Sequence, residues 1–333
     1  MTDDRRARLR GIKLQALVRD HLGRDIVPAL GAFPPGAALV ESGGAWVLLE
    51  DEPERGLGPA LAWAHRQGAG SLQVLAGRST GLLARRAAGF HVPITVWYVE
   101  ERSLLPAVAE PPIVPAPAAP DHLALVDTIV AGGAVAVIEH GVVTGEVRGL
   151  EVCRVVDDGH TGTVRLEVGV GAHDREAFAI IHGDVPTVDA LADVVRAVTD
   201  RRGVDPQHPL TRLAPERLLR WRLEQQPAQL GFAAVAPAQP PVPRSNVKDR
   251  VPCTAIGRRD DGSTVLLVCS AGVDLDLVPY AIDARLATLD GERGEPGVAG
   301  EVWLVLPPRD LVPVTAELAS LADQALSLVP FAG

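Results

Sequence analysis

Two proline-rich stretches divide this chain and limit what it can fold into. The first reads PAVAEPPIVPAPAAP at Pro106–Pro120, and the second reads PAQLGFAAVAPAQPPVP at Pro227–Pro243. Prolines spaced this closely cannot continue a helix or a central strand, and they favour extended chain. The sequence therefore predicts three folded domains separated by two linkers. In chain order these segments are 1–105, 106–120 (linker), 121–226, 227–243 (linker) and 244–333.

A similar local pattern recurs in the three predicted domains. In the first domain, Ala38–Arg66 has the pattern of a strand, a glycine turn, a second strand, a loop and a helix. Thr254–Arg285 of the third domain has the same order, and Leu150–Ile181 of the second again has a hairpin followed by a helical pattern. The turns at Gly43-Gly44 and Asp261-Gly262 supply the positive φ angles that tight hairpins need. This recurrence predicts an internal repeat.

The repeat also predicts the fold class. Pro59 and Pro279 fit the first turn of a helix, where a backbone N–H is not required. Another apolar strand pattern then follows, at Ser71–Gly77 in the first domain and at Glu301–Pro308 in the third. Each unit is therefore expected to be α/β, with a β-hairpin that leads through a helix into another strand. Two pairs of segments match: Val47-Leu48-Leu49 with Val265-Leu266-Leu267, and Leu57-Gly58-Pro59 with Leu277-Val278-Pro279.

A helical pattern, RLRGIKLQALVRDHLG at Arg8–Gly23, precedes the first hairpin. The order of helix, hairpin, helix and strand resembles the core of the restriction-endonuclease-like fold. In that family a strand acid and a Glu-x-Lys or Asp-x-Lys sequence hold Mg²⁺ and activate water. The matching positions here are Glu167-Val168-Gly169 and Val268-Cys269-Ser270, while lysine occurs only at Lys13 and Lys248. The resemblance therefore implies degenerate cores that lack the catalytic signature.

The densest group of potential metal ligands lies in the second domain. Strand alternation places Glu151 on one face with Cys153, and it places Glu167 on the following strand. If the hairpin register brings the two carboxylates together, they could hold a divalent metal such as Mg²⁺ with the loop residues that follow. Alternatively, the acids form a solvated sheet face and a charged first helical turn. The candidate ligands in this domain are Glu146, Glu151, Glu167, His173 and Asp174.

Two aspartates in the third domain form a second candidate site. Asp274 and Asp276 precede a predicted helix in the stretch GVDLDLVPYAIDAR. They could bind a metal or another ligand, or they could stabilise the start of the helix through its dipole. The equivalent stretch of the first domain carries Glu54 and Arg55 but has no Asp-x-Asp sequence, so the repeat does not require these aspartates.

Composition limits the classes of function. The formal net charge of −10 disfavours nucleic-acid binding, except through the first domain, which is close to neutral. Its N-terminal basic residues could contact nucleic acid or form the solvated face of an amphipathic helix. The three cysteines are too few and too scattered for a disulfide framework or a zinc site. The basic residues in question are Arg5, Arg6, Arg8, Arg10 and Lys13.

These features lead to three hypotheses. The N-terminus lacks the apolar core of a signal peptide, and no run is long enough to span a membrane, so we expect a cytoplasmic protein without membrane association. The leading hypothesis is a binding or assembly protein without evident catalytic machinery, which recognises an unknown protein partner or associates with itself. The alternatives are a metal-dependent hydrolase of the phosphodiesterase or nuclease type, with its site in the second domain, and nucleic-acid binding through the first domain.

Overall fold

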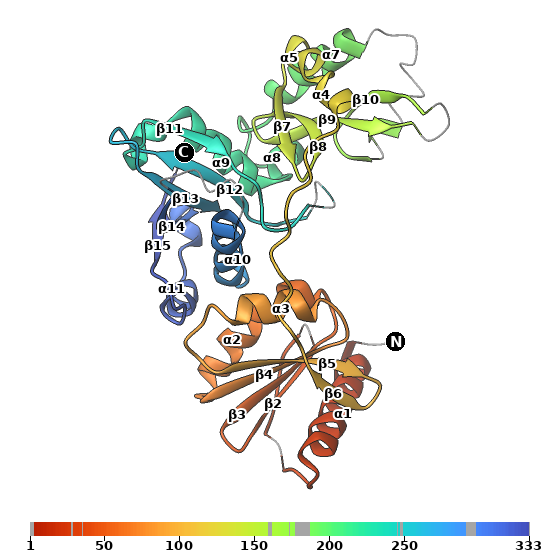
Figure 1. Ribbon diagram of the computed structural model, residues 1–333, viewed down its shortest axis with the longest axis vertical. Helices are drawn as coiled ribbons and strands as arrows, with labels where there is room; N and C mark the ends of the chain where they lie inside the picture. Colours follow the sequence, from red (N-terminus) through yellow and green to blue (C-terminus); the bar gives the residue numbers. More distant parts are fainter. Residues whose placement is uncertain are drawn as a thin grey trace. The chain divides into compact units, whose positions relative to one another are not determined.

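The chain forms two compact units that together contain three β-sheets (Figure 1). Unit 1 comprises Met1–Pro112, Val273–Leu286 and Leu311–Ser327, and unit 2 comprises Ile113–Gly272, Ala287–Asp310 and Leu328–Gly333. The predicted mixed α/β class is confirmed. The computed structural model describes residues 3–27, 29–34, 36–158, 162–172, 174–176, 187–244, 246, 249–290 and 298–332.

The sheet of unit 1 has six strands in the order β1-β2-β3-β4-β5-β6. The first three strands pair antiparallel, β3, β4 and β5 pair parallel, and β6 closes the sheet antiparallel to β5. The predicted hairpin between β2 and β3 is present, but its turn lies one residue earlier than expected, at Ser42 and Gly43, which have positive φ, while Gly44 begins β3 and pairs with Glu41. The strands are β1 (Ala29–Gly31), β2 (Gly36–Glu41), β3 (Gly44–Leu49), β4 (Ser71–Ala76), β5 (Ile94–Glu100) and β6 (Ser103–Pro106).

Helices cover both faces of this sheet (Figure 1). Leu14, Leu17 and Val18 of α1 (Asp3–Leu22) pack on one face against Leu39 and Leu48. The parallel crossovers contribute α2 (Leu57–Arg66), which packs against β4, and α3 (Thr80–Ala87), which packs against β5. The buried apolar face of α1 is therefore formed by Leu14, Leu17 and Val18, whereas Leu9 and Ile12 are exposed. Unit 1 also includes η1 (Pro53–Arg55), most of α10 (Leu277–Asp290) and α11 (Pro313–Ser320).

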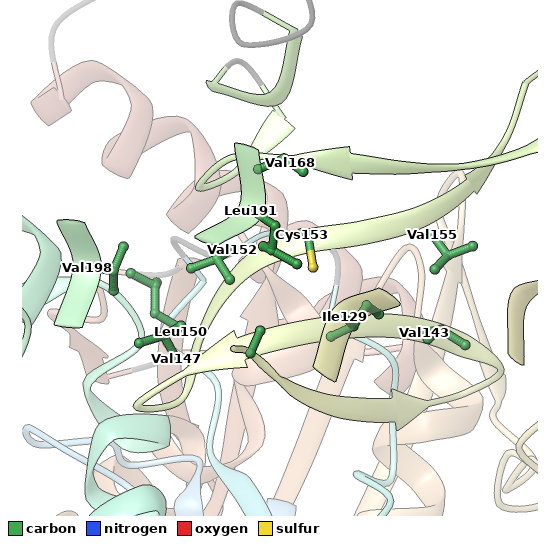
Figure 2. Close-up of a cluster of buried hydrophobic side chains, with 11 residues drawn as sticks. Ile129, Val143, Val147, Leu150, Val152, Cys153, Val155, Val168, Leu191 and Val198 are labelled. Carbon is green, nitrogen blue, oxygen red and sulfur yellow. The ribbon is translucent and has the colours of Figure 1, made fainter. Parts of the chain in front are cut away.

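The second sheet lies in unit 2 and is antiparallel throughout, in the order β10-β9-β8-β7. Its core is filled by aliphatic side chains from the strands and from α5 and α7, which point toward one another in Figure 2. Within the described residues no parallel crossover strand joins this sheet, so the second part does not share the full order of the other two. The elements are α4 (Pro120–Leu123), α5 (Val126–Ala131), β7 (Val135–Glu139), β8 (Val142–Val147), β9 (Leu150–Asp157), β10 (Val164–Val168), α7 (Thr187–Thr199) and α8 (Pro209–Arg212).

The third sheet has the order β11-β12-β13-β14-β15. Strands β11 to β13 pair antiparallel, and α10 connects β13 to its parallel neighbour β14, so this sheet repeats the order seen in β1 to β4. The predicted Asp261-Gly262 hairpin is confirmed between β12 and β13. The strands are β11 (Ala234–Pro237), β12 (Cys253–Arg258), β13 (Thr264–Cys269), β14 (Val298–Leu306) and β15 (Leu326–Pro330).

The two proline-rich segments have different structures. Residues 107–119, all of them described, contain no helix or strand. The segment 227–243 is not simply a linker, because it contains η2 (Pro227–Leu230) and the edge strand β11. Proline is tolerated in edge strands because the outer side of such a strand pairs with no neighbour, so a missing backbone N–H there breaks no hydrogen bond of the sheet. Pro237 is the last residue of the edge strand β11.

The helix α9 (Pro215–Gln225) belongs to the core of the third sheet, although it falls inside the predicted domain 121–226. Leu219 and Leu223 of α9 pack with Phe232, and with apolar residues of β12 and β13. No described helix is both long enough and apolar enough to cross a bilayer.

A buried arginine and carboxylate cluster as the candidate functional site

A β-bulge decides how the acids of the predicted metal site are arranged. The pairing of β8 with β9 shifts by one residue, so that Gly145 faces Cys153 while Glu146 faces Glu151. A bulge of this kind reverses the alternation of side chains beyond it. Glu151 therefore shares a face with Arg154, and the predicted face shared by Glu151 and Cys153 is wrong. Cys153 instead points into the aliphatic core (Figure 2).

The same sheet face also receives Glu167. The register pairs Glu167 of β10 with Arg154 of β9. Glu151 accepts two hydrogen bonds of 2.9 Å from Arg154 and one of 2.9 Å from Nη1 of Arg175. Nε of Arg175 lies 3.4 Å from Glu167, whose other oxygen is 2.8 Å from Arg165. The register therefore does not place Glu151 directly beside Glu167, and the two carboxylates are linked through Arg175.

The loop after β10 contributes less to this cluster. Oδ2 of Asp174 accepts a 2.7 Å hydrogen bond from the backbone N–H of Val170, and the side chain is exposed. This hydrogen bond stabilises the turn after β10, which contains Gly171. The backbone N–H of Arg175 donates to the carbonyl of Gly171 in the same turn, and the side chain of Arg175 contacts Glu151. His173 lies outside the described residues.

Glu146 is a second buried acid of the cluster. One of its oxygens is 2.5 Å from Nη1 of Arg217, and the other is 2.8 Å from Nη2 of Arg220. Arg217 also reaches Glu139 at 2.5 Å, and Arg220 reaches Glu224 at 3.0 Å. Burial alone would raise the pKa of Glu146, but the charges of Arg220 and Arg217 outweigh it and hold that pKa below its ordinary value.

Helix α9 supplies these two arginines. Arg217 and Arg220 are three residues apart and therefore lie on one side of the helix, while Leu219 and Leu223 face the third sheet. Both guanidinium groups are buried, and their long apolar stems pack within the unit. This role was not predicted from the sequence, where the pattern PERLLRWRLEQ, with arginines between apolar positions, is the signal that indicates it.

A small cavity of about 50 Å³ opens beside this cluster. Its walls come from the β7–β8 turn, from β8 and β9, from α9, and from the segment that precedes β12. The lining residues are Glu139, His140, Val142, Thr144, Glu146, Glu151, Arg154, Arg217, Pro243 and Arg244.

Arg244 differs from the other arginines around this cavity. Its side chain is 9% exposed, and among the described residues its ion-pair partner is Glu151, whose carboxylate oxygen lies 3.9 Å from Nη2. Nη1 is buried and has no hydrogen-bond partner among the described residues. Burial, followed by the nearby charge of Arg217, lowers the pKa of Arg244. A buried guanidinium nitrogen without a partner is costly, so this group requires an explanation.

The aspartates of the third predicted domain have a different role, within unit 1. Asp274 lies 2.8 Å from Arg55, and Oδ2 of Asp276 lies 2.8 Å from Nη1 of Arg86. Oδ1 of Asp276 accepts a 3.0 Å hydrogen bond from the N–H of Gly58 at the start of α2. Glycine is needed there because a Cβ would lie 1.8 Å from the carbonyl oxygen of Leu275. Asp276 directly precedes α10, which is the position expected of a helix-start residue. Asp274 and Asp276 both contact arginines that are distant in the sequence.

A third aspartate completes this buried network. Asp283 of α10 is fully buried, and it accepts hydrogen bonds of 2.7 Å from Nε of Arg85 and 3.2 Å from Nε of Arg86. Three aspartates and three arginines therefore attach α10, and the segment that precedes it, to η1, α2 and α3 inside unit 1.

We expect Asp276 to make the stability of unit 1 depend on pH. Burial raises the pKa of Asp276 to about 7, against the opposing charge of Arg86. Between pH 4 and 7 the folded state then binds more protons than the unfolded state. The free energy of unfolding of unit 1 is therefore highest, as far as Asp276 is concerned, below about pH 4, and it falls as the pH rises to about 7. Urea unfolding at a series of pH values should show this decline, and Asp276→Asn should flatten it. An unchanged slope in the variant would contradict the assignment.

The other candidate groups are also held by the fold. Burial raises the pKa of Cys153 to about 12, which disfavours the thiolate that a nucleophile needs. Arg10 of α1 lies 3.0 Å from Glu50 and 2.6 Å from Asp51, and Lys13 lies 2.7 Å from Glu50. These acids neutralise part of the basic face considered for nucleic-acid binding, which stays a prediction.

No three His, Cys, Asp or Glu side chains within the described ranges are grouped so that they could hold a metal ion. Comparisons of the chain with models of known protein families, with curated proteins and with solved structures found no match.

Proposed function

We propose that this protein is a binding protein, which acts through recognition of a ligand or partner, rather than a metal-dependent hydrolase. The observation that carries this proposal is the ion pairing of the candidate carboxylates. Glu146 and Glu151 each contact two arginines within 3.0 Å, and Glu167 is shared by Arg165 and Arg175.

Arginine and a metal ion compete for the same carboxylate oxygens. A divalent metal would have to displace guanidinium groups that already satisfy these oxygens, and it would bring two further positive charges close to several arginines. The lysine that activates water in the restriction-endonuclease-like family has no counterpart here, because neither Lys13 nor Lys248 lies in the required sequence. These features favour recognition over hydrolysis.

The proposal predicts that metals do not stabilise the protein. Thermal unfolding of metal-stripped protein should show the same midpoint with and without millimolar Mg²⁺, Mn²⁺ or Zn²⁺. A ligand present at about a hundred times its dissociation constant would add roughly 2.7 kcal/mol to the native state. A metal-dependent rise that Glu167→Ala abolishes would contradict the proposal and would support the hydrolase hypothesis. Asp193→Ala is the matched control, because it removes an exposed acid of unit 2.

A further inference from the structure

We propose that the cavity beside Arg244 binds a compact oxyanion, either a carboxylate group or a phosphate group. This inference rests on the proposed binding function and names the class of ligand. One guanidinium nitrogen beside this cavity lacks a hydrogen-bond acceptor in the described structure. Nη1 of Arg244 is buried and has no hydrogen-bond partner among the described residues, and Arg244 is one of the residues that line the cavity. An oxygen of a bound anion would supply such a partner.

The balance of charge at this end of the cavity is positive. Within the described residues, five arginines contact the three glutamates that line it. Arg175 and Arg220 have a further acid outside the cavity, in Glu167 and Glu224. Arg154 and Arg244 have only Glu151 as an ion-pair partner in the described structure, and that carboxylate is already held by Arg175. Three arginines therefore contact Glu151, and in the described structure only Arg175 among them has a second acid, Glu167.

The shape and the chemistry of the cavity limit the ligand. A volume of about 50 Å³ exceeds the room that one water molecule needs, and it suits a single carboxylate or phosphate group rather than a nucleotide. Guanidinium groups match both anions because their planar N–H donors can contact two oxygens at once. Thr144 adds a hydroxyl group to the wall, although this group already donates to the carbonyl of Val137 and is free only to accept. The donors available to an oxyanion are therefore the arginines.

A bound anion would also explain why the protein retains Arg244, whose incompletely paired buried charge lowers the free energy of unfolding. An incompletely paired buried charge destabilises a protein, and its replacement by a neutral side chain of similar size is often neutral or stabilising. Binding sites tolerate this loss of stability, because the bound ligand supplies the interaction that the buried charge lacks. Arg244→Gln should therefore give a ligand-free protein at least as stable as the wild type. A purely structural arginine would give the opposite result.

The test is a titration of the intact chain with sodium phosphate and, separately, sodium acetate, at ionic strength held constant with sodium chloride. Thermal unfolding and calorimetry are measured for the wild type, for Arg244→Gln and for the control Arg196→Gln, which removes an exposed arginine of the same unit. At about a hundred times the dissociation constant, we expect a rise of about 5–10 °C in the unfolding midpoint. The rise should be lost in Arg244→Gln and kept in Arg196→Gln.

Each outcome has a defined meaning. A response to phosphate alone, to acetate alone or to both supports the site and identifies the anion. No response to either anion, or an equal response in Arg244→Gln, overturns the site. A low stability of Arg244→Gln together with an unchanged heat of anion binding also overturns it. Failure of the binding-protein proposal is distinct, because it would appear as the metal-dependent stabilisation that requires Glu167.

Discussion

Asp283→Ala should lower the free energy of unfolding of unit 1 by about 3–5 kcal/mol. Asp283 is fully buried, and it is the carboxylate that Arg85 and Arg86 share. The alanine variant would leave two buried guanidinium groups with fewer partners, and removal of one side of a buried ion pair costs more than the pair itself contributes. Arg86 would keep Asp276, and Arg85 would keep the carbonyl of Pro111, so the helices should still form.

Two measurements check this expectation. Urea unfolding followed by the fluorescence of Trp63 on α2, with the other tryptophans replaced by phenylalanine, reports on unit 1. Hydrogen exchange of peptides from α10 reports on its local opening. The matched control is Glu54→Ala, which breaks the exposed 2.9 Å ion pair with Arg78 in the same unit and should cost at most about 1 kcal/mol. If α10 exchanges as slowly in Asp283→Ala as in the wild type, the network does not hold this helix.

Local features of the fold could be predicted from the sequence because they are set by neighbouring residues. Gly43 and Gly262 mark hairpins since few residue types adopt their positive φ angles, and both hairpins are present, although the first turn lies at Ser42-Gly43 rather than at Gly43-Gly44. Pro59 and Pro279 lie in the first turns of α2 and α10, as expected. The predicted repeat of hairpin, helix and strand corresponds to the shared order of the first and third sheets.

The candidate sites depend on contacts between distant parts of the chain and on strand register, neither of which can be predicted from a short stretch of sequence. Asp276 and Asp283 find their partners in Arg86 and Arg85, about two hundred positions earlier in the chain. The bulge between β8 and β9 reverses the face of Glu151, and no turn residue or proline marks it. The sequence could therefore identify the acids of the second domain as a group, but not the arginines that contact them.

The aspartates of unit 1 and the glutamates of unit 2 have different surroundings, and this difference indicates which group is structural and which forms the candidate site. In unit 1, Asp276 and Asp283 satisfy arginines inside closely packed helices, and the arrangement attaches α10 to its neighbours. In unit 2, the acids border a cavity, and one guanidinium nitrogen of Arg244 has no partner in the described structure. The first network is complete without a ligand, whereas the second lacks an acceptor. This contrast is why the second network is the candidate site.

Glu146→Ala should lower the free energy of unfolding of unit 2 by about 3–5 kcal/mol. The carboxylate is buried between Arg217 and Arg220, and its loss would leave both guanidinium groups with only the more exposed Glu139 and Glu224. Urea unfolding followed by the fluorescence of Trp303 in β14, again as the single tryptophan, measures the change. The control is Glu301→Ala, which removes an exposed ion pair of 2.8 Å with Arg259 and should leave the stability close to that of the wild type.

The same variant should change anion binding in the opposite direction. Glu146 lines the cavity, so its removal makes the walls more positive while Arg244 and Arg154 are retained. Phosphate or acetate should therefore raise the unfolding midpoint of Glu146→Ala by more than it raises that of the wild type, even though the ligand-free variant is less stable. A variant that loses stability and also loses its response to anions would show that Glu146 only maintains the packing of α9. A larger response would show that the acid limits the affinity of the cavity for anions, which is expected if the cluster balances folding stability against binding.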